Sequence, residues 1–244
     1  MTSNIPVTVF GAYGHTGRFV VSELRRRGLT TIISGRDEAK LNAFGDAHPE
    51  FEVRAASIDD PASLERAISG AAAVINCAGP FLDTALPVVD AALRARIHYL
   101  DVTAEQRSAL AVYERYAGAA RNAGVVIAPA MAFYGGLGDL LATAAMGDWT
   151  EADEINIGIA LDIWQPTRGT RLTGQRNTGR RFVFSNHKLE FLAEPPPTTE
   201  WDFPPPFGRQ EMVCLPFSEI ITVSKHLPVS EIRTYIGLTQ KAKM

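Results

Sequence analysis

A cluster of glycines after a short apolar stretch is the feature of this sequence that most directly indicates chemistry. Residues 7–10 predict a buried strand, and glycines follow at positions 11, 14 and 17, where a pattern typical of an amphipathic helix begins. Glycine lets the backbone turn tightly and approach a pyrophosphate, and the first turn of the helix offers free N–H groups to an anion. The order of strand, glycine turn and helix therefore predicts a dinucleotide site rather than an ordinary turn. The residues expected to contact the cofactor there are Gly11, Tyr13, Gly14, His15, Thr16 and Gly17.

The end of the second predicted strand, at residues 31–36, indicates which dinucleotide binds. Sites specific for NAD carry a carboxylate about 20 residues after the glycines, where it accepts hydrogen bonds from the adenosine ribose. This sequence has Arg36 at the strand end, and a guanidinium can hold a 2′-phosphate through charge-assisted hydrogen bonds. We therefore expect NADP(H), with Ser34 and Lys40 adding polar contacts, although Arg36 could instead be a solvated loop charge. Asp37 is expected to cap the helix that follows.

Further candidate contacts lie at the ends of the third and fourth predicted strands. Ligands of a parallel, doubly wound sheet bind beyond the carboxyl ends of its strands. Asp59 follows the third strand and could accept a hydrogen bond from the adenine amino group or cap the next helix. The fourth strand runs into a glycine turn formed by Ala78, Gly79 and Pro80, which we expect to border the cofactor.

The residues available for proton transfer lie in the fifth predicted strand, 97–102. Strand alternation puts Tyr99 and Asp101 on one face and His98 on the other. Asp101 is the first choice for orienting a substrate or moving a proton, with Tyr99 beside it, although each could serve the structure alone. No tyrosine is followed four residues later by lysine, so the Tyr-Lys mechanism of short-chain dehydrogenases is disfavoured.

Strands and helices alternate through the first part of the chain, which predicts a Rossmann-type, doubly wound parallel sheet. The expected fold class is α/β, with an NADP-binding domain at residues 1–148 and a smaller, mainly β domain at 149–244. The predicted strands of the first domain are 7–10, 31–36, 51–55, 73–80, 97–102 and 125–128, and the helices after the first are 37–44, 60–68, 86–95 and 105–121.

The second half has a different pattern, in which apolar and polar residues alternate at period two. This pattern predicts strands at 154–163, 181–192, 219–224 and 231–236. Seven of the 15 prolines lie in 195–216, which predicts an extended loop or a docking motif for a proline-binding partner. Five arginines spaced by glycines in 168–181 could form a lid that closes on an anionic substrate, or a solvated loop.

Composition limits the remaining function classes. The chain has 244 residues, 46% of them hydrophobic, and a net charge of −3, which favours neither a nucleic acid nor a membrane surface as partner. No run of about 18 apolar residues occurs, and Met1 to Asn4 lack the features of a signal peptide, so we expect a cytoplasmic protein. The two cysteines, Cys77 and Cys214, are expected to be free thiols, and no spacing of His and Cys indicates a metal site.

Several segments together resemble one family of oxidoreductases. The segments are GAYGHTG, ISGR, VINCAGPF, HYLDVTAEQ and GVVIAPAMAFYGGLGDLLA, and with them residues 5–146 are similar to the saccharopine dehydrogenase-like NADP-binding oxidoreductases, which include saccharopine reductases and trans-acting enoyl reductases. The resemblance implies a Rossmann domain followed by a mixed sheet with substrate and dimer contacts. Two departures are Ala104–Glu105, where the family pattern has Gly-Glu, and the end at Met244, which predicts a shortened C-terminal segment.

These observations favour an NADP(H)-dependent oxidoreductase that transfers hydride to or from a C=N, C=O or C=C bond of a small metabolite. The alternative is an NADP(H)-binding sensor or accessory subunit without turnover, because no catalytic pair is visible. We also expect a homodimer, since a sheet that begins near Ile155 needs a covered face and protected edges.

Overall fold

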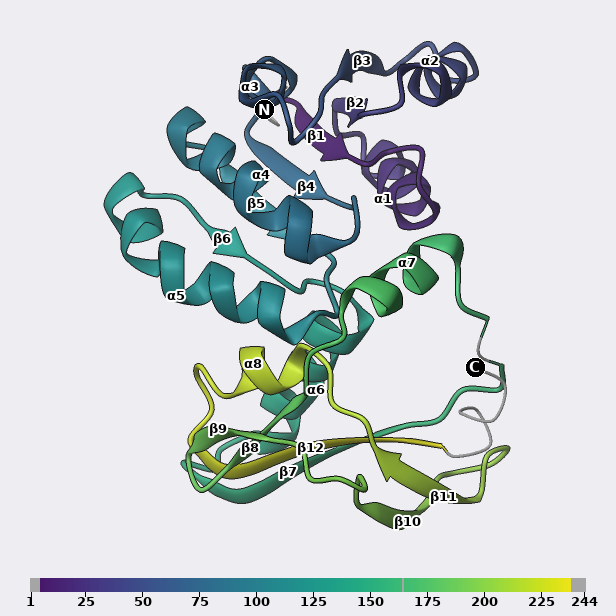
Figure 1. Ribbon diagram of the computed structural model, residues 1–244, viewed down its shortest axis with the longest axis vertical. Coiled ribbons are helices and arrows are strands. Elements are labelled where there is room, and N and C mark those ends of the chain that lie inside the picture. The colour runs from purple at the N-terminus through teal and green to yellow at the C-terminus, as the bar shows by residue number, and fades with distance from the viewer. Residues whose placement is uncertain (1–4, 164, 238–244) are drawn as a thin grey trace.

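The computed structural model describes residues 5–163 and 165–237, which form two sheets with helices around and between them (Figure 1). The first sheet contains the N-terminal half of the chain, and the second sheet lies at the opposite end of the molecule (Figure 1). Residues 1–4 and 238–244 lie outside the described ranges, and so do the expectations about a signal peptide and a shortened C-terminus.

The first sheet is parallel and has the strand order of a doubly wound fold, as predicted. Its strands are β1 (Val7–Phe10), β2 (Thr31–Gly35), β3 (Glu52–Ala55), β4 (Ala73–Asn76), β5 (His98–Asp101) and β6 (Ile127–Ala128). They lie in the order β3-β2-β1-β4-β5-β6, so the order reverses between β1 and β4. A crevice for a ligand is expected at this reversal, beyond the carboxyl ends of the two strands.

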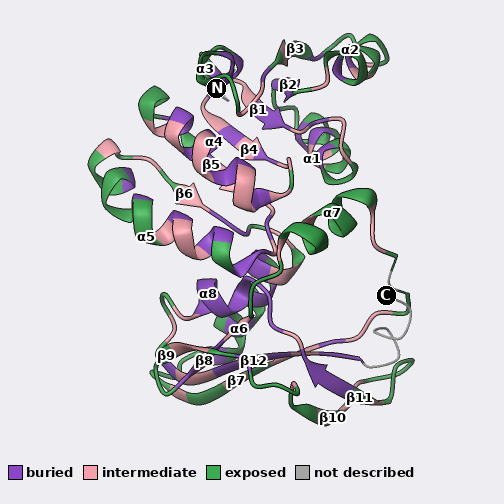
Figure 2. Cartoon of the chain, viewed as in Figure 1, coloured by how far each residue is buried: buried purple, intermediate pink, exposed green. Residues whose placement is uncertain are grey.

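Helices cover both faces of this sheet, because each strand presents apolar side chains on two sides. The helices are α1 (His15–Arg26), α2 (Glu38–Asp46), α3 (Pro61–Ile68), α4 (Phe81–Ala95) and α5 (Gln106–Ala123). Val9, Ile33 and Leu41 belong to the apolar cluster that α1 and α2 close. The cluster on the other face, under α3, α4 and α5, is larger (Figure 2).

Helix α4 begins five residues earlier than predicted, at Phe81 rather than Leu86. The prediction was wrong because Pro87 fits the first turn of a helix, where its missing N–H costs nothing. Here Pro87 lies inside the helix, and the free N–H groups of Phe81 and Leu82 are satisfied by Glu105, a residue distant in the sequence.

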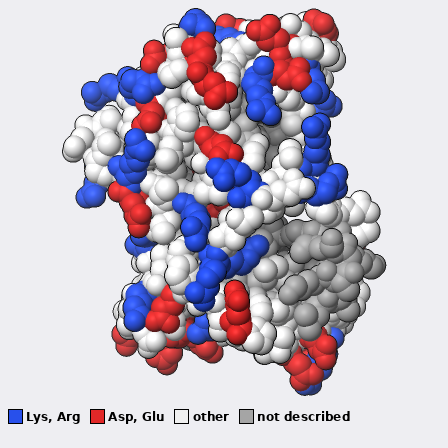
Figure 3. All heavy atoms as spheres, in the orientation of Figure 1, with Lys and Arg blue, Asp and Glu red and all other residues white. Residues whose placement is uncertain are grey.

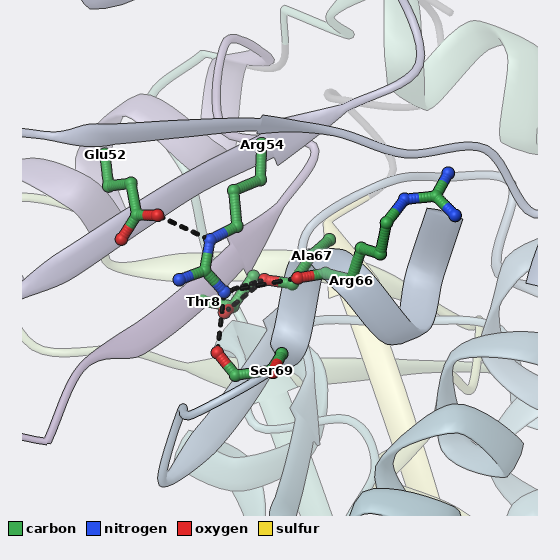
Figure 4. A network of polar contacts seen from close by, with 6 residues as sticks. All are labelled: Thr8, Glu52, Arg54, Arg66, Ala67 and Ser69. Carbon is green, nitrogen blue, oxygen red and sulfur yellow. Dashed lines mark hydrogen bonds and ion pairs between the residues drawn. The ribbon is translucent and has the colours of Figure 1, made fainter. Parts of the chain in front are cut away.

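The outer strand β3 is fixed to α3 by one arginine (Figure 4). Arg54 donates from Nη1 to the carbonyl oxygens of Arg66 at 3.2 Å and Ser69 at 2.6 Å, and from Nε to Glu52 at 2.8 Å. The last carbonyl groups of a helix lack partners within the helix, so a guanidinium suits this position. The contact ties the sheet edge to the C-terminus of α3.

The second sheet is mostly antiparallel. Its strands are β7 (Ala152–Ile159), β8 (Phe182–Ser185), β9 (Lys188–Phe191), β10 (Thr198–Asp202), β11 (Arg209–Cys214) and β12 (Val229–Gly237). β12 pairs in parallel with β7 and antiparallel with β8 and β11. Before β7 come a π-helix, η1 (Phe133–Leu137), and α6 (Gly138–Met146), and α8 (Glu219–Val223) lies beside them. Ala142 of α6 and Ile220 of α8 pack in one cluster with Ile232 of β12, so these helices cover apolar side chains of the sheet.

Three predictions for the second half were wrong. Residues 219–224 form the buried helix α8 rather than a strand, because a short apolar run does not distinguish the two (Figure 2). The proline-rich segment 195–216 contains β10 and β11, since its proline runs precede β10 and form the turn rather than fill the strands. The arginine-rich segment contains the helix α7 (Arg168–Arg176), whose first turn is capped by Thr167.

Candidate functional site

The turn between β1 and α1 has a backbone that only glycine accommodates at two positions. Gly11 has a φ of +84°, and a Cβ atom there would lie 2.9 Å from the backbone nitrogen of Ala78. A Cβ atom on Gly17 would lie 2.2 Å from the carbonyl oxygen of Gly11. Gly14 is less restricted, with the same oxygen at 3.1 Å. The glycines therefore bring β1, α1 and the loop after β4 into close backbone contact.

The N-terminus of α1 is open. Gly14 is its N-cap residue, no side chain caps it, and its first turn has no acidic residue. His15 and Thr16 are exposed in that turn, and the His15 ring meets Phe19 edge-on at 5.2 Å. Unpaired N–H groups and the helix dipole favour an anion at such a terminus. The turn has the shape and polarity that a pyrophosphate requires.

The end of β2 places the residues predicted to select NADP(H) in different environments. Arg36 is exposed and has no hydrogen bond or ion pair with any described residue. The ammonium group of Lys40 pairs with the Asp37 carboxylate, which caps α2 as expected. Ser34 is fully buried, and its hydroxyl has no hydrogen-bond partner among the described residues. This position gives the Ser34 hydroxyl no exposed surface for the expected cofactor contact, because helices cover both faces of β2.

Tyr13 connects the glycine turn to β2. Its hydroxyl accepts a hydrogen bond from the backbone N–H of Asp37 at 3.1 Å, and its ring lies against Gly35. A Cβ atom on Gly35 would be 2.6 Å from the ring, so the glycine makes room for it. Tyr13 therefore holds the start of α2 close to the turn.

Asp59 lies in the loop between β3 and α3, where it is exposed and accepts a long hydrogen bond of 3.4 Å from Ser57. The helix cap in this loop is its neighbour Asp60, which accepts from the backbone N–H of Ser63 at 3.2 Å. Asp59 is thus free of the capping role that was its alternative in the sequence.

The loop after β4 is held by a buried asparagine. Asn76 accepts from the backbone N–H of Ala78 at 3.0 Å and donates to Thr84 at 3.2 Å. Gly79 and Pro80 follow, directly before α4. The loop lies against the glycine turn, since Ala78 is the residue that a Cβ atom on Gly11 would meet.

Tyr99 and Asp101 are side by side, as strand alternation predicts, but both are completely buried. The Tyr99 hydroxyl donates to Asp101 Oδ2 at 2.7 Å, and Asp101 Oδ1 accepts from the backbone N–H groups of Thr103 and Ala130. Burial raises the pKa of the Asp101 carboxyl, although these hydrogen bonds oppose the rise. The pair fixes the loops after β5 and β6, and neither side chain reaches a position where a substrate could contact it directly.

Glu105 is a residue that borders the site and that the motifs of the sequence did not single out. It is 1% exposed, and its two carboxylate oxygens accept from the backbone N–H groups of Phe81 at 2.8 Å and Leu82 at 3.0 Å. It thereby caps α4 in the position that an external anion could otherwise occupy. The only signal for it was its place in the Gly-Glu pattern of the family that the sequence resembles.

Helix α7 of the second half reaches the carboxyl edge of the first sheet (Figure 1). Its Thr173 hydroxyl lies 3.2 Å from the point where a Cβ atom on Gly79 would be. Its Arg176 forms an ion pair with Asp83 in the first turn of α4. Nη2 donates to Asp83 Oδ1 at 2.9 Å, and Nε donates to Oδ1 at 3.1 Å and to Oδ2 at 3.3 Å. The arginine-rich segment thus lies over the loop after β4 as a helix, rather than as flexible backbone.

Two further findings concern charge and reactive groups. Positive and negative side chains are interspersed over the face of the molecule that Figure 3 shows.

Burial raises the pKa of the Cys77 thiol to about 12, so it stays protonated. Within residues 5–163 and 165–237, no three His, Cys, Asp or Glu side chains are grouped to hold a metal ion, and no helix is long and apolar enough to span a membrane.

The parallel sheet and its open, glycine-lined helix terminus define a dinucleotide-binding protein of the Rossmann class. Residues 7–127 match the family described as the saccharopine dehydrogenase NADP binding domain, and through them the chain belongs to that family. The resemblance drawn from the sequence motifs is therefore confirmed.

Individual relatives agree with this family. A saccharopine dehydrogenase-like oxidoreductase of Bos taurus is 29% identical over 139 residues, which are 50% of this chain and 32% of that protein. Apo saccharopine dehydrogenase (L-Glu forming) of Saccharomyces cerevisiae superimposes with a TM-score of 0.64 over 95% of this chain and 54% of its own, at 14% identity, and shares the fold. The chain thus spans about half of that structure, and its match covers about a third of the curated relative.

The expectation of a cytoplasmic protein is contradicted by the names of other relatives. A subunit of NADH dehydrogenase from Dictyostelium discoideum, 39% identical over 87 residues, 34% of this chain and 24% of that protein, is named mitochondrial. A saccharopine dehydrogenase-like oxidoreductase of Arabidopsis thaliana is named probable mitochondrial, and a Caenorhabditis elegans relative is named a lipid droplet localized protein. The prediction was wrong because composition and the residue types of 1–4 do not specify a compartment.

Proposed function

We propose that this chain binds NADP(H) at the carboxyl edge of the first sheet. The observation that supports this most directly is the open N-terminus of α1 beside glycines whose Cβ atoms would fill the space at the turn. Arg36, which has no partner among the described residues, would hold the 2′-phosphate, with Lys40 one helical turn away. Asp59 and the loop of Ala78, Gly79 and Pro80 would border the rest of the cofactor.

We further propose that the protein is an oxidoreductase acting on a C=N, C=O or C=C bond of a small metabolite. The bound dinucleotide would supply or accept the hydride, and the chain would orient the substrate and exclude water. Tyr99, Asp101 and Asn76 would act by positioning the strand ends. Helix α7, with exposed arginines at 168 and 171, lies where it could contact an anionic substrate.

One observation favours the alternative of an NADP(H)-binding sensor or accessory subunit without turnover. The side chains expected to move a proton, Tyr99 and Asp101, are completely buried and bonded to each other. A panel of imines, enones and 2-oxo acids separates the two functions, because an oxidoreductase should oxidise NADPH with at least one of these classes. Binding of NADPH without turnover on any of them would support the sensor.

The cofactor assignment is tested by titration with NADPH and NADH. We expect NADPH to bind at least tenfold more tightly, a difference of about 1.4 kcal/mol. Arg36→Ala should remove most of this preference while leaving NADH affinity nearly unchanged, since only the phosphate contact is lost. Arg121→Ala, at an exposed arginine near the end of α5, is the matched control. Equal affinities for the two cofactors in the unmodified chain would contradict the assignment.

We also propose a homodimer, although not for the reason that the sequence suggested, since α6 and α8 already cover apolar side chains of the second sheet. Several large apolar side chains between residues 131 and 149 remain exposed, and such groups mark interaction surfaces. Light scattering at micromolar concentration should give twice the mass of one chain, and a single monomeric species would exclude the dimer. The exposed side chains assigned to this surface are Met131, Leu140 and Trp149.

A further inference from the structure

A cavity of about 300 Å³ lies in the second half of the chain, between the η1–α6 segment, β7 and the loop that joins β10 to β11. Small-molecule pockets begin at about this volume and combine apolar walls with a few polar groups. None of its lining residues belongs to the proposed cofactor site. Its apolar walls include Phe133, Leu137, Leu141, Ile157, Phe203 and Phe207.

One carboxyl group lies in the wall of this cavity. Glu219, the first residue of α8, is 1% exposed and packs against Gly138. Its Oε1 accepts from the backbone N–H of Phe217 at 2.8 Å and from the Thr234 hydroxyl. Its Oε2 is buried and has no hydrogen-bond partner within the described part of the chain. A buried polar atom without a partner is costly, so the fold leaves one unused acceptor on a residue that lines an apolar cavity.

The groups around Glu219 determine its charge. Burial raises the pKa of Glu219 to about 7, while the bonds from Thr234 and Phe217 and the nearby Arg181 oppose the rise. The Arg181 guanidinium donates to the carbonyl oxygen of Pro216 at 2.9 Å and lies over the Phe217 ring. Above neutral pH the carboxylate therefore has two acceptor oxygens and no donor.

We propose that this cavity binds a small, largely apolar molecule with one hydrogen-bond-donating group, a hydroxyl or an ammonium group, which bonds to Oε2 of Glu219 while its hydrocarbon part fills the cavity. Such a ligand would give Oε2 its missing partner and would cover the apolar wall. A carboxylate at the same end is excluded by its like charge, and a ketone offers no donor. Because Oε2 has almost no accessible surface, binding includes a small outward movement of the wall.

The proposal is tested with four eight-carbon molecules that differ in one polar group. Binding of octylamine, 1-octanol, 2-octanone and octanoate to the full chain is measured by calorimetry at pH 8.5, where Glu219 is ionised. We expect the amine and the alcohol to bind at least tenfold more tightly than the ketone and the carboxylate. Equal affinities for all four, or no binding of any, would overturn the proposal.

Glu219→Gln provides the sharper comparison, because the amide keeps one oxygen for Phe217 and Thr234 and places a donor where Oε2 was. In this variant 2-octanone should bind more tightly than octylamine, the reverse of the order in the unmodified chain. The fold of the variant is checked by circular dichroism and thermal unfolding. An unchanged order in a folded variant would refute the role of Glu219.

A second pair of variants keeps the test valid if Glu219→Gln does not fold. Phe207→Ala removes part of the wall and should weaken the amine and the alcohol three- to tenfold. Phe191→Ala, at a similarly exposed phenylalanine outside the cavity, should leave both affinities unchanged. Equal effects of the two substitutions would place the binding elsewhere.

Discussion

The N-termini of α1 and α4 follow adjacent parallel strands, β1 and β4, and the fold treats them in opposite ways. The terminus of α1 has no side-chain cap and no acidic residue in its first turn. The terminus of α4 is occupied by the Glu105 carboxylate, and Asp83 in its first turn is paired with Arg176 of α7. Both termini have the same dipole, so the side chains around them decide which one stays available to an anionic ligand.

This difference separates a binding role from a structural one. An open terminus beside glycines can accept a pyrophosphate without displacing protein groups. A terminus whose N–H groups already bond to a buried carboxylate contributes to stability instead. Changes at the two termini should therefore alter different measurements.

The largest effect is expected at Gly17. Gly17→Val places a side chain where even a Cβ atom would be 2.2 Å from the Gly11 carbonyl oxygen, so the turn must open and lose its contact with the loop after β4. NADPH affinity measured by fluorescence titration should fall at least 100-fold, about 2.7 kcal/mol. Gly118→Ala, at a helical glycine with open space around it, is the control. Normal affinity in the valine variant would show that this turn does not hold the phosphates.

Glu219 is a second buried carboxylate that can be compared with Glu105. Only one of its oxygens accepts a hydrogen bond from a backbone N–H, whereas both oxygens of Glu105 accept one. Both side chains are 1% exposed, and burial raises the pKa of both carboxyls, that of Glu219 from 4.5 to about 7. The folded state thus holds this proton more tightly than the unfolded chain, so the stability contribution of Glu219 is full below pH 4.5 and falls as the pH rises to about 7. The loss corresponds to about 3 kcal/mol at about 1.4 kcal/mol per pKa unit.

Urea unfolding at pH 5 and pH 8 measures this loss. Glu219→Gln should reduce the difference between the two pH values, and the part that remains is assigned to Asp101 and Glu105, whose pKa values burial also raises. Glu114→Gln, at an exposed glutamate of α5, should retain the full difference. The same pH dependence in the Glu219 variant and the unmodified chain would mean that Glu219 is not the titrating group.

Glu105→Ala should lower stability without weakening the cofactor. It leaves the N–H groups of Phe81 and Leu82 without their acceptors, which costs about 2 kcal/mol in the free energy of unfolding. NADPH affinity should stay within twofold, because the pyrophosphate is assigned to α1. Glu105→Gln keeps one acceptor oxygen and should lose about half as much. Loss of NADPH binding in a folded Glu105→Ala variant would show that the two termini act together.

Local signals were sufficient where a residue acts on its own neighbours. The glycine turn, the cap of α2 and the alternation of strands and helices in the first half follow from patterns within a few residues, as Asp37 illustrates. The cap of α3 is Asp60 and not Asp59, the candidate that the sequence offered. Glu105 and Glu219 were missed because their partners are distant in the sequence or belong to another element. The burial of Ser34 could not be predicted from its place at a strand end, because it depends on the helices that cover both sides of β2.

The smallest effect is expected for the ion pair between Arg176 and Asp83, which closes the α4 terminus from the other side. The Arg176 side chain is 57% exposed and the Asp83 side chain 38%, so solvent weakens their attraction, and Arg176→Gln should change the free energy of unfolding little. The pair should instead control how firmly α7 lies over the loop after β4, because α7 has no buried residue to hold it. Hydrogen exchange of the α7 amides should therefore become faster in Arg176→Gln and in high salt. Reversing the pair, with Arg176→Asp and Asp83→Arg in one chain, should restore much of the protection. Hydrogen-exchange rates that stay the same in Arg176→Gln, in high salt and in the reversed pair would show that other contacts hold α7 in place.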